Sequence, residues 1–195
     1  MTEPDARARR EYGAALALLG AGGALLLISF GLTWGTAQVP LLAGAEGAVR
    51  VEAFTGRDLF PAAAMSGWIA LAGVAGIVAT RSWGRVLVAA ICLAAGLAGT
   101  IAALAYATAP ARFIDAAASA TAGSPLAAAS ESTLGWLVAG FAGVVVVAAS
   151  GAAIVRGRRW PRLGARYERT ARTQRPVSPW EAQDLGHDPT ADLVE

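Results

Sequence analysis

Four long apolar stretches alternate with short polar ones along this chain of 195 residues. Each stretch runs about twenty residues without an acidic or basic side chain and lacks the polar stripe of a helix at a soluble surface. About twenty helical residues span the hydrocarbon core of a bilayer. The pattern therefore predicts four transmembrane helices, at residues 14–34, 61–80, 86–108 and 134–155. We expect an all-α membrane protein, folded as a four-helix transmembrane bundle.

The connections between the predicted spans carry patterns of their own. Residues 49–53 alternate apolar with charged side chains, a glycine-rich turn precedes them at 44–47, and residues 38–42 could supply a partner strand. These features favour a small extracytoplasmic β-hairpin. An isolated hairpin is marginally stable, so it would need support from the second outer loop, where residues 111–120 could form a short helix.

Small residues recur at a spacing of four along the predicted spans. Apolar helices gain no hydrophobic stabilisation against one another in lipid, so close approach over small residues must hold a bundle together. We expect these faces to make helix contacts, although a chain rich in alanine and glycine also produces such spacings by chance. The faces are Gly13, Ala17 and Ala21; Ala72 and Gly76; Gly96 and Thr100; and Gly135, Ala139 and Gly143.

The charges predict the orientation of the spans. All sixteen basic side chains are arginine, and fourteen acidic ones leave a net charge of +2, too small to indicate nucleic-acid binding. Thirteen arginines lie in the N-terminal segment 1–13, the turn 81–85 and the tail 156–195, against three in the other two loops. Positive charge collects on the cytoplasmic side. We therefore expect a multi-pass protein of the plasma membrane with both termini in the cytoplasm and the lipid bilayer as its surroundings.

Aromatic side chains support that orientation, because tryptophan and tyrosine prefer the headgroup level. The sequence places Tyr12, Trp83 and Trp160 at the inner ends of the spans, and Trp34, Tyr106 and Trp136 at the outer ends. Trp68 lies about two turns into the second span, where we expect it to pack between helices.

The tail begins with an arginine cluster, followed by arginines at spacings of four, three and three. On a helix formed after Pro161 they would share one face, which could lie on anionic lipid. A solvated arginine run is the alternative, and the pattern leaves both open. The candidate lipid-headgroup residues are Arg156, Arg158, Arg159, Arg162, Arg166, Arg169 and Arg172.

The end of the tail has the pattern of a short capped helix. Ser178, Pro179 and Glu181 form a capping box with proline at the first helical position, and Gly186 would end the helix. Such a short helix is unstable alone in water, so something must hold it, and a cytoplasmic protein partner is one candidate. The candidate partner-docking residues are Trp180, Glu181, Leu185, Gly186, Asp188, Pro189 and Thr190.

The same segment carries a family resemblance. It looks like the Trp biosynthesis-associated membrane protein family of actinobacteria, whose members typically end in a W-(D/E)-A-x-D-x-G-x-D-P-T signature. The matching residues are Trp180, Glu181, Ala182, Asp184, Gly186, Asp188, Pro189 and Thr190, with further matches at Thr33, Trp34, Thr55, Gly56, Trp83, Gly84 and Arg85. The resemblance implies a small multi-pass protein whose genes tend to lie beside tryptophan biosynthesis genes, with no assigned activity.

Candidate chemistry is sparse. No Cys or His pair has metal-ligand spacing, the single cysteine, Cys92, lies within a span, and the single histidine, His187, lies in the tail. We expect no enzymatic activity and no cofactor. Our preferred hypothesis is a non-catalytic accessory protein whose tail docks a partner. The alternative is an uncoupled exporter or facilitator for tryptophan or a related small molecule, which would require a homo-oligomer around a pore of small residues.

Overall fold

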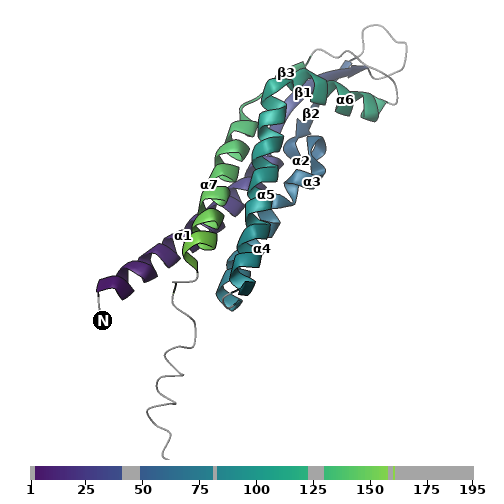
Figure 1. Cartoon of the computed structure of the whole chain (residues 1–195). Helices are drawn as coiled ribbons and strands as arrows, with labels where there is room; N and C mark the ends of the chain where they lie inside the picture. The colour runs from purple at the N-terminus through teal and green to yellow at the C-terminus, as the bar shows by residue number, and fades with distance from the viewer. Residues whose placement is uncertain (1–2, 41–48, 81–82, 123–129, 158–159, 161–195) are drawn as a thin grey trace, which may run out of the picture. The chain divides into compact units, whose positions relative to one another are not determined.

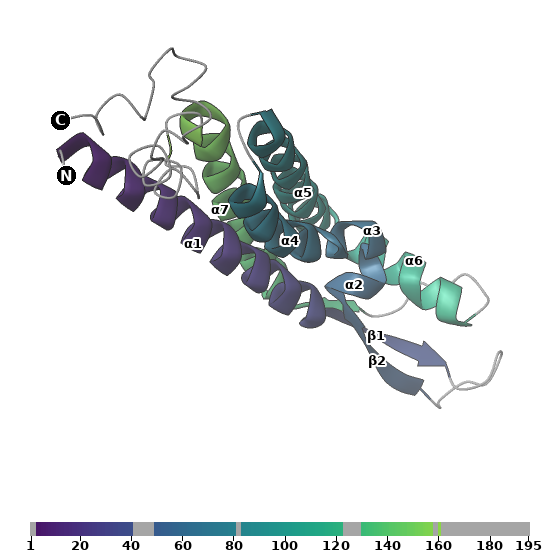
Figure 2. The same cartoon turned by 90° about the horizontal axis from the view of Figure 1, so that it is seen from below.

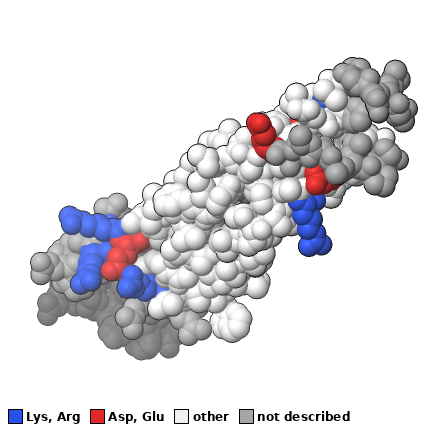
Figure 3. Space-filling model, turned by 90° about the horizontal axis from the view of Figure 1, so that it is seen from above, with Lys and Arg blue, Asp and Glu red and all other residues white. Residues whose placement is uncertain are grey.

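In the part of the chain that the structure describes, four helices are long and apolar enough to cross a membrane. The structure is a computed structural model, and it describes residues 3–40, 49–80, 83–122, 130–157 and 160. The candidate spans within them are Arg7–Gly31, Pro61–Ala79, Trp83–Thr108 and Gly135–Arg156. On the face shown in Figure 3, charged side chains gather at two ends with uncharged surface between them. The expected multi-pass, helical membrane protein is therefore confirmed.

The elements form a bundle and a cap at one end of it (Figure 1). In chain order they are α1 (Glu3–Gly31), β1 (Thr33–Pro40), β2 (Val49–Thr55), α2 (Gly56–Leu59), α3 (Pro61–Ala64), α4 (Ser66–Ala79), α5 (Trp83–Thr108), α6 (Pro110–Ala122), β3 (Ser130–Ser132) and α7 (Gly135–Arg156). Within the bundle α1 packs against α4 and α7, and α5 packs against the same two helices (Figures 1 and 2). The four long helices therefore form a closed ring of contacts. We call the three strands with α2 and α6 the cap.

The first and third spans differ most from the sequence-based ranges, and the other two agree within one residue at each end. The first helix ends at Gly31, and Trp34, expected at its outer end, lies instead in β1. Strand pairing explains this, because the backbone from Thr33 onward bonds to neighbouring strands. The third long helix begins at Trp83, so Arg85 lies inside α5.

The cap contains the expected hairpin within a larger sheet. Its strand order is β2-β1-β3, and both pairings are antiparallel. The first strand begins at Thr33, five residues before the predicted partner strand, and its register with β2 shifts between Thr33 and Gly35. The third strand was not predicted. It comes from the second outer loop, together with α6, which confirms the short helix expected there, so this loop supplies the support that an isolated hairpin lacks.

Small residues bring α5 and α7 together as expected. A Cβ atom added to Gly143 would lie 2.3 Å from Thr100 Oγ1 and 2.9 Å from the backbone oxygen of Gly96. A Cβ on Gly96 would in turn meet Val146 and Val147 of α7. These backbones therefore approach so closely that no side chain fits between them.

The same expectation was wrong for α1. Gly13, Ala17 and Ala21 are all exposed, and a Cβ on Gly13 would meet nothing within 4 Å. The helix packs instead through Gly22, against α7, and Gly23, against α4. On the packed face the residues four positions from these glycines are leucines, and Leu19, Leu26 and Phe30 are buried there, so the large apolar side chains lie on the inward face.

The predicted aromatic belts are also partly wrong. Trp34 and Tyr106 are fully buried, because they form the joint between the bundle and the cap. Trp68, expected between helices, is 60% exposed and faces outward. Trp83 is 75% exposed at the other end of the bundle, as a headgroup-level tryptophan would be.

Candidate functional site

Trp34 lies at the centre of the joint between bundle and cap. The register shift in β1 gives this strand one residue more than β2 at this point, and such a bulge redirects a side chain. The indole is completely buried, and its Nε1–H donates a 2.9 Å hydrogen bond to the backbone oxygen of Ser29. Aromatic rings surround it, with centroid separations of 5.1 Å to Phe30, 5.3 Å to Tyr106 and 5.8 Å to Phe60. We call Phe30, Trp34, Phe60, Tyr106 and Phe113 the Trp34 cluster.

Two glycines give this indole the space that it needs. A Cβ atom on Gly56 would lie 2.5 Å from Cε2 of Trp34, and one on Gly135 would lie 3.0 Å from its Cδ1. The contact at Gly56 is closer than a real Cβ atom approaches, so a larger residue there would displace the ring; a Cβ on Gly135 would also lie 2.9 Å from the backbone oxygen of Thr33. Two segments of the chain therefore come together here. Thr33 pairs with Thr55 across the sheet, and Trp34 lies against Gly56.

Backbone polar groups around Trp34 bond within the fold. The carbonyl oxygen of Trp34 accepts hydrogen bonds from the Tyr106 hydroxyl and from the N–H of Thr133, the latter at 2.8 Å. The Thr133 hydroxyl donates to the carbonyl oxygen of Thr33. The second outer loop and α5 are therefore bonded to the same stretch of β1.

The Asp58 carboxylate also has a structural role, as a helix cap. Its Oδ2 accepts hydrogen bonds from the Thr55 N–H at 2.8 Å and the Thr55 hydroxyl at 2.6 Å, and the Thr55 side chain accepts from the Asp58 N–H at 3.4 Å. These contacts form a capping box at the start of α2. This carboxylate therefore fixes the turn between the sheet and the second span.

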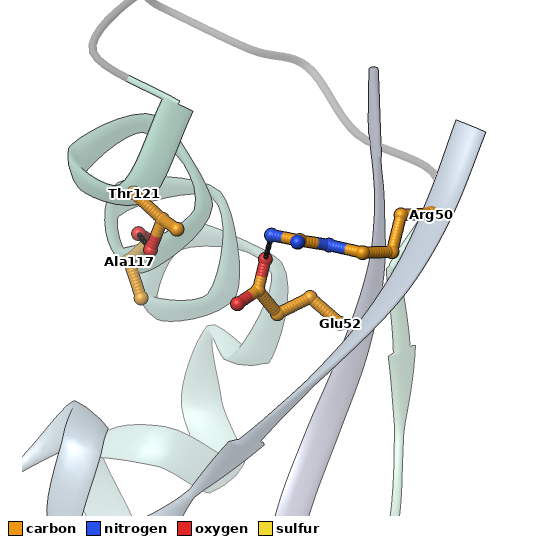
Figure 4. Close-up of polar contacts among 4 residues, drawn as sticks. All are labelled: Arg50, Glu52, Ala117 and Thr121. Atoms are coloured by element: carbon orange, nitrogen blue, oxygen red, sulfur yellow. Dashed lines mark hydrogen bonds and ion pairs between the residues drawn. The ribbon is translucent and has the colours of Figure 1, made fainter. Parts of the chain in front are cut away.

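Charged side chains of the hairpin pair with each other on the cap surface. Arg50 Nη2 lies 2.9 Å from Glu52 Oε2, and both side chains point toward α6 near Thr121 and Ala117 (Figure 4). The Thr121 hydroxyl donates to the backbone oxygen of Ala117. Arg50 is 58% exposed, so water and salt screen the pair, which contributes little to stability. The arrangement is an exposed surface pair.

An apolar groove lies beside the joint, between the start of the second span and the half of α5 nearer the cap. Its volume is about 520 Å³. Sequence reasoning missed it, although the alanine-rich stretches around Ala62 and Ala102 could have indicated that two helices leave space between them. The lining residues are Leu59, Phe60, Pro61, Ala62, Ala63, Ala98, Ile101, Ala102 and Ala105.

The sequence-predicted site residues belong almost entirely to the tail. All seven partner-docking residues, from Trp180 to Thr190, lie outside the residues that the structure describes, as do six of the seven lipid-headgroup arginines. The remaining one, Arg156, is exposed in the last turn of α7. Both assignments therefore stay predictions.

Cys92 and His187 are the one cysteine and the one histidine of the sequence. Cys92 is buried in the bundle, where its thiol faces Gly73 at van der Waals range and the backbone oxygen of Ile69 at 3.9 Å. His187 lies outside the described residues. Among the described residues no group of three or more His, Cys, Asp or Glu side chains could hold a metal ion.

Comparison with protein families gives a match over most of the chain. The family model described as "Tryptophan-associated transmembrane protein" matches residues 16–190. This range includes most of the first span, the other three spans, the cap and the tail segment predicted to dock a partner. No curated protein and no solved structure matches the chain.

Proposed function

The chain belongs to the tryptophan-associated transmembrane protein family, and we propose that it is a non-catalytic accessory protein of the plasma membrane whose cytoplasmic tail docks a protein partner. The bundle anchors the chain and the cap closes its outer end. The tail, from Arg156 onward, would carry the recognition residues. In this proposal the protein acts by recruiting its partner to the membrane.

The enclosed state of Trp34 is the observation that carries this proposal. The Trp34 side chain is completely buried. Its indole N–H donates a hydrogen bond to the backbone oxygen of Ser29, and the Trp34 carbonyl oxygen accepts one from Tyr106. The largest fully buried side chains near it, Phe30, Tyr106 and Ile114, fill the same joint. Such packing supports a scaffold, because a site for a ligand would leave some of these groups accessible.

Charge distribution supports the orientation that recruitment needs. An even number of spans brings both termini to one side, and five described arginines lie there: Arg7, Arg9, Arg10 and Arg156 are exposed, and Arg85 is buried. Positive side chains at span ends favour the cytoplasmic side. The tail would therefore face cytoplasmic proteins.

Affinity capture with the full-length protein tests the recruitment proposal. The protein would be solubilised in a mild detergent from its native membrane and compared with Trp180→Ala, with partners identified by mass spectrometry. Leu193→Ala is the matched control, since it truncates an apolar tail residue beyond residues 16–190. We expect a partner that the wild type and Leu193→Ala retain and Trp180→Ala loses. Equal recovery with all three proteins would contradict docking through this segment.

The alternative function is an uncoupled exporter or facilitator for tryptophan or a related small molecule, and the apolar groove favours it. A groove of about 520 Å³ next to Pro61 and Ile101 has the size and polarity to hold an indole ring. Efflux of tryptophan from intact cells would separate the two functions. Ile101→Trp, which fills the groove, would lower efflux if the chain transports, whereas removal of the tail from Arg175 onward would leave it unchanged.

A further inference from the structure

Arg85 is a buried cation at the bundle end opposite the cap. It lies in the first turn of α5, and only 4% of the residue is exposed. Its Nη1 donates a 2.9 Å hydrogen bond to the backbone oxygen of Gly157, just beyond the last turn of α7. The guanidinium therefore links two spans at the level where they leave the membrane.

Two aromatic side chains complete the surroundings of Arg85. Its Cζ lies 5.5 Å from the centroid of the Tyr12 ring on α1, within cation–π range. The Tyr12 ring meets the Trp160 ring edge to face, with centroids 5.4 Å apart. We call Tyr12, Arg85 and Trp160 the basic pocket.

Three polar atoms of the basic pocket are buried without a hydrogen-bond partner among the described residues. They are Arg85 Nε, Trp160 Nε1 and Tyr12 Oη. Each carries a hydrogen that it can donate. An unmatched buried donor costs on the order of 1–3 kcal/mol, and more when the group is charged. Three such donors in one place indicate an acceptor that the described chain does not supply.

The missing acceptor should carry negative charge. Ion pairs among the described residues join Arg7 to Glu11 and Arg50 to Glu52, and neither includes Arg85. A carbonyl oxygen and an aromatic face offset only part of the cost of burying a guanidinium. The position adds to this preference, because the free N–H groups in the first turn of α5 give the helix start a partial positive charge.

The depth of the basic pocket in the membrane indicates which kind of anion would bind there. Trp83, two residues before Arg85, is 75% exposed at the end of the candidate span, where a tryptophan contacts lipid headgroups. Arg7, Arg9 and Arg156 on the neighbouring helix ends raise the local concentration of anions. We propose that the basic pocket binds the phosphate group of an anionic phospholipid, with Arg85 as the cationic anchor and Trp160 and Tyr12 as further donors.

Lipid-dependent stabilisation of the purified full-length protein tests this site. Unfolding would be followed by intrinsic fluorescence in detergent during titration with phosphatidylglycerol, phosphatidylcholine or inorganic phosphate. Titrations at about 1 M salt, where the Debye length is about 3 Å, suppress the attraction of exposed arginines. Arg85→Gln would be compared with Arg156→Gln, which removes the same charge from an exposed position of the same bundle end.

We expect phosphatidylglycerol to stabilise the wild type more strongly than phosphatidylcholine or inorganic phosphate does. At high salt, Arg85→Gln should weaken the apparent affinity about tenfold, because it loses a charge-assisted hydrogen bond. Arg156→Gln should change it by about twofold or less, since its contribution is screened. Trp160→Phe and Tyr12→Phe, which remove one donor each, should weaken it about threefold.

Several results would overturn the proposal. Equal affinities of the wild type and Arg85→Gln for phosphatidylglycerol would show that Arg85 does not bind the headgroup. Equal stabilisation by inorganic phosphate would identify a soluble anion, and an absent lipid response would indicate that the chain itself supplies the acceptor. If Arg85→Gln does not fold, Arg85→Lys and Trp160→Phe carry the test, because both keep the charge of the pocket, and unchanged affinity in both would contradict the site.

Discussion

The hydroxyl of Tyr106 donates a hydrogen bond to the backbone carbonyl oxygen of Trp34, which joins α5 to the bulge in β1. The two residues are 72 positions apart in the chain, and both are completely buried. Their ring planes are inclined at 62°, with 5.3 Å between the centroids. This one contact connects a transmembrane helix to the strand at the centre of the cap, so it is the natural place to test how far the two depend on each other.

Tyr106→Phe should lower the stability of the cap modestly. The substitution keeps the ring packing and removes one of the two hydrogen bonds to the Trp34 carbonyl, while the Thr133 N–H bond remains. We expect a loss of about 1 kcal/mol in the free energy of unfolding, measured by thermal unfolding in detergent. Thr108→Ala is the control, because its exposed hydroxyl bonds only within α5, to Ala105. A larger loss in Thr108→Ala than in Tyr106→Phe would contradict this assignment.

Gly143→Ala should destabilise the contact between α5 and α7. The added methyl group would lie 2.9 Å from the backbone oxygen of Gly96 and from the backbone nitrogen of Thr100, which cannot rotate away. Overpacking of this kind costs about 1–3 kcal/mol. Gly151→Ala, on the same helix with nothing within 4 Å of the new atom, should be neutral or slightly stabilising. Thermal unfolding of the two variants compares them directly.

Asp58→Ala should loosen the turn between β2 and the second span. It removes both hydrogen bonds to Thr55 and with them the capping box. A lost helix cap costs about 1 kcal/mol. We expect faster amide hydrogen exchange in residues 54–60 and little change in the centre of α5. Arg57→Ala, at the adjacent exposed position, serves as the control, and equal exchange in both variants would count against a special role of Asp58.

Cysteine labelling tests the proposed orientation. Cys92 is the only cysteine and is buried, so Cys92→Ala gives a background for single cysteines. In intact cells a membrane-impermeant maleimide should label Ser132→Cys, in the cap, and should not label Arg156→Cys until the membrane is permeabilised. The opposite pattern would place the termini outside and would remove the basis for recruitment of a cytoplasmic partner.

The main elements of the fold were readable from the sequence because each depends on local pattern. Twenty uncharged residues specify a span regardless of what it packs against, and the alternation at Val49–Ala53 predicted a strand that the structure contains in β2. The third strand, Ser130–Ser132, escaped prediction because three small or polar residues carry no periodicity. Its pairing with β1 depends on a contact across about one hundred residues.

The candidate sites depended on packing, which a pattern does not contain. Tryptophan and tyrosine are residue types that favour the membrane interface, as predicted for Trp34 and Tyr106. In the fold, the bulge in β1 and the space at Gly56 place the Trp34 indole in the interior instead. Arg85 was counted as part of an inner turn, although its spacing from Ala89 and Cys92 places it on the buried face of α5. That spacing was the signal that could have revealed the basic pocket. The tail motif lies outside the described residues, so its sequence remains the only guide to it.

The strand order β2-β1-β3 has a consequence for biosynthesis. After the first two spans have entered the bilayer, the central strand can pair with β2 alone, and its other edge stays open. Ser130–Ser132 becomes available only when the third helix has crossed and the ribosome has advanced by about ninety residues beyond the hairpin's first strand. The sheet can therefore be completed only when the last loop lies on the same side of the membrane as the hairpin. A chain that stalls before β3 would present an unsatisfied β edge, which is a feature that quality-control proteases and chaperones can recognise.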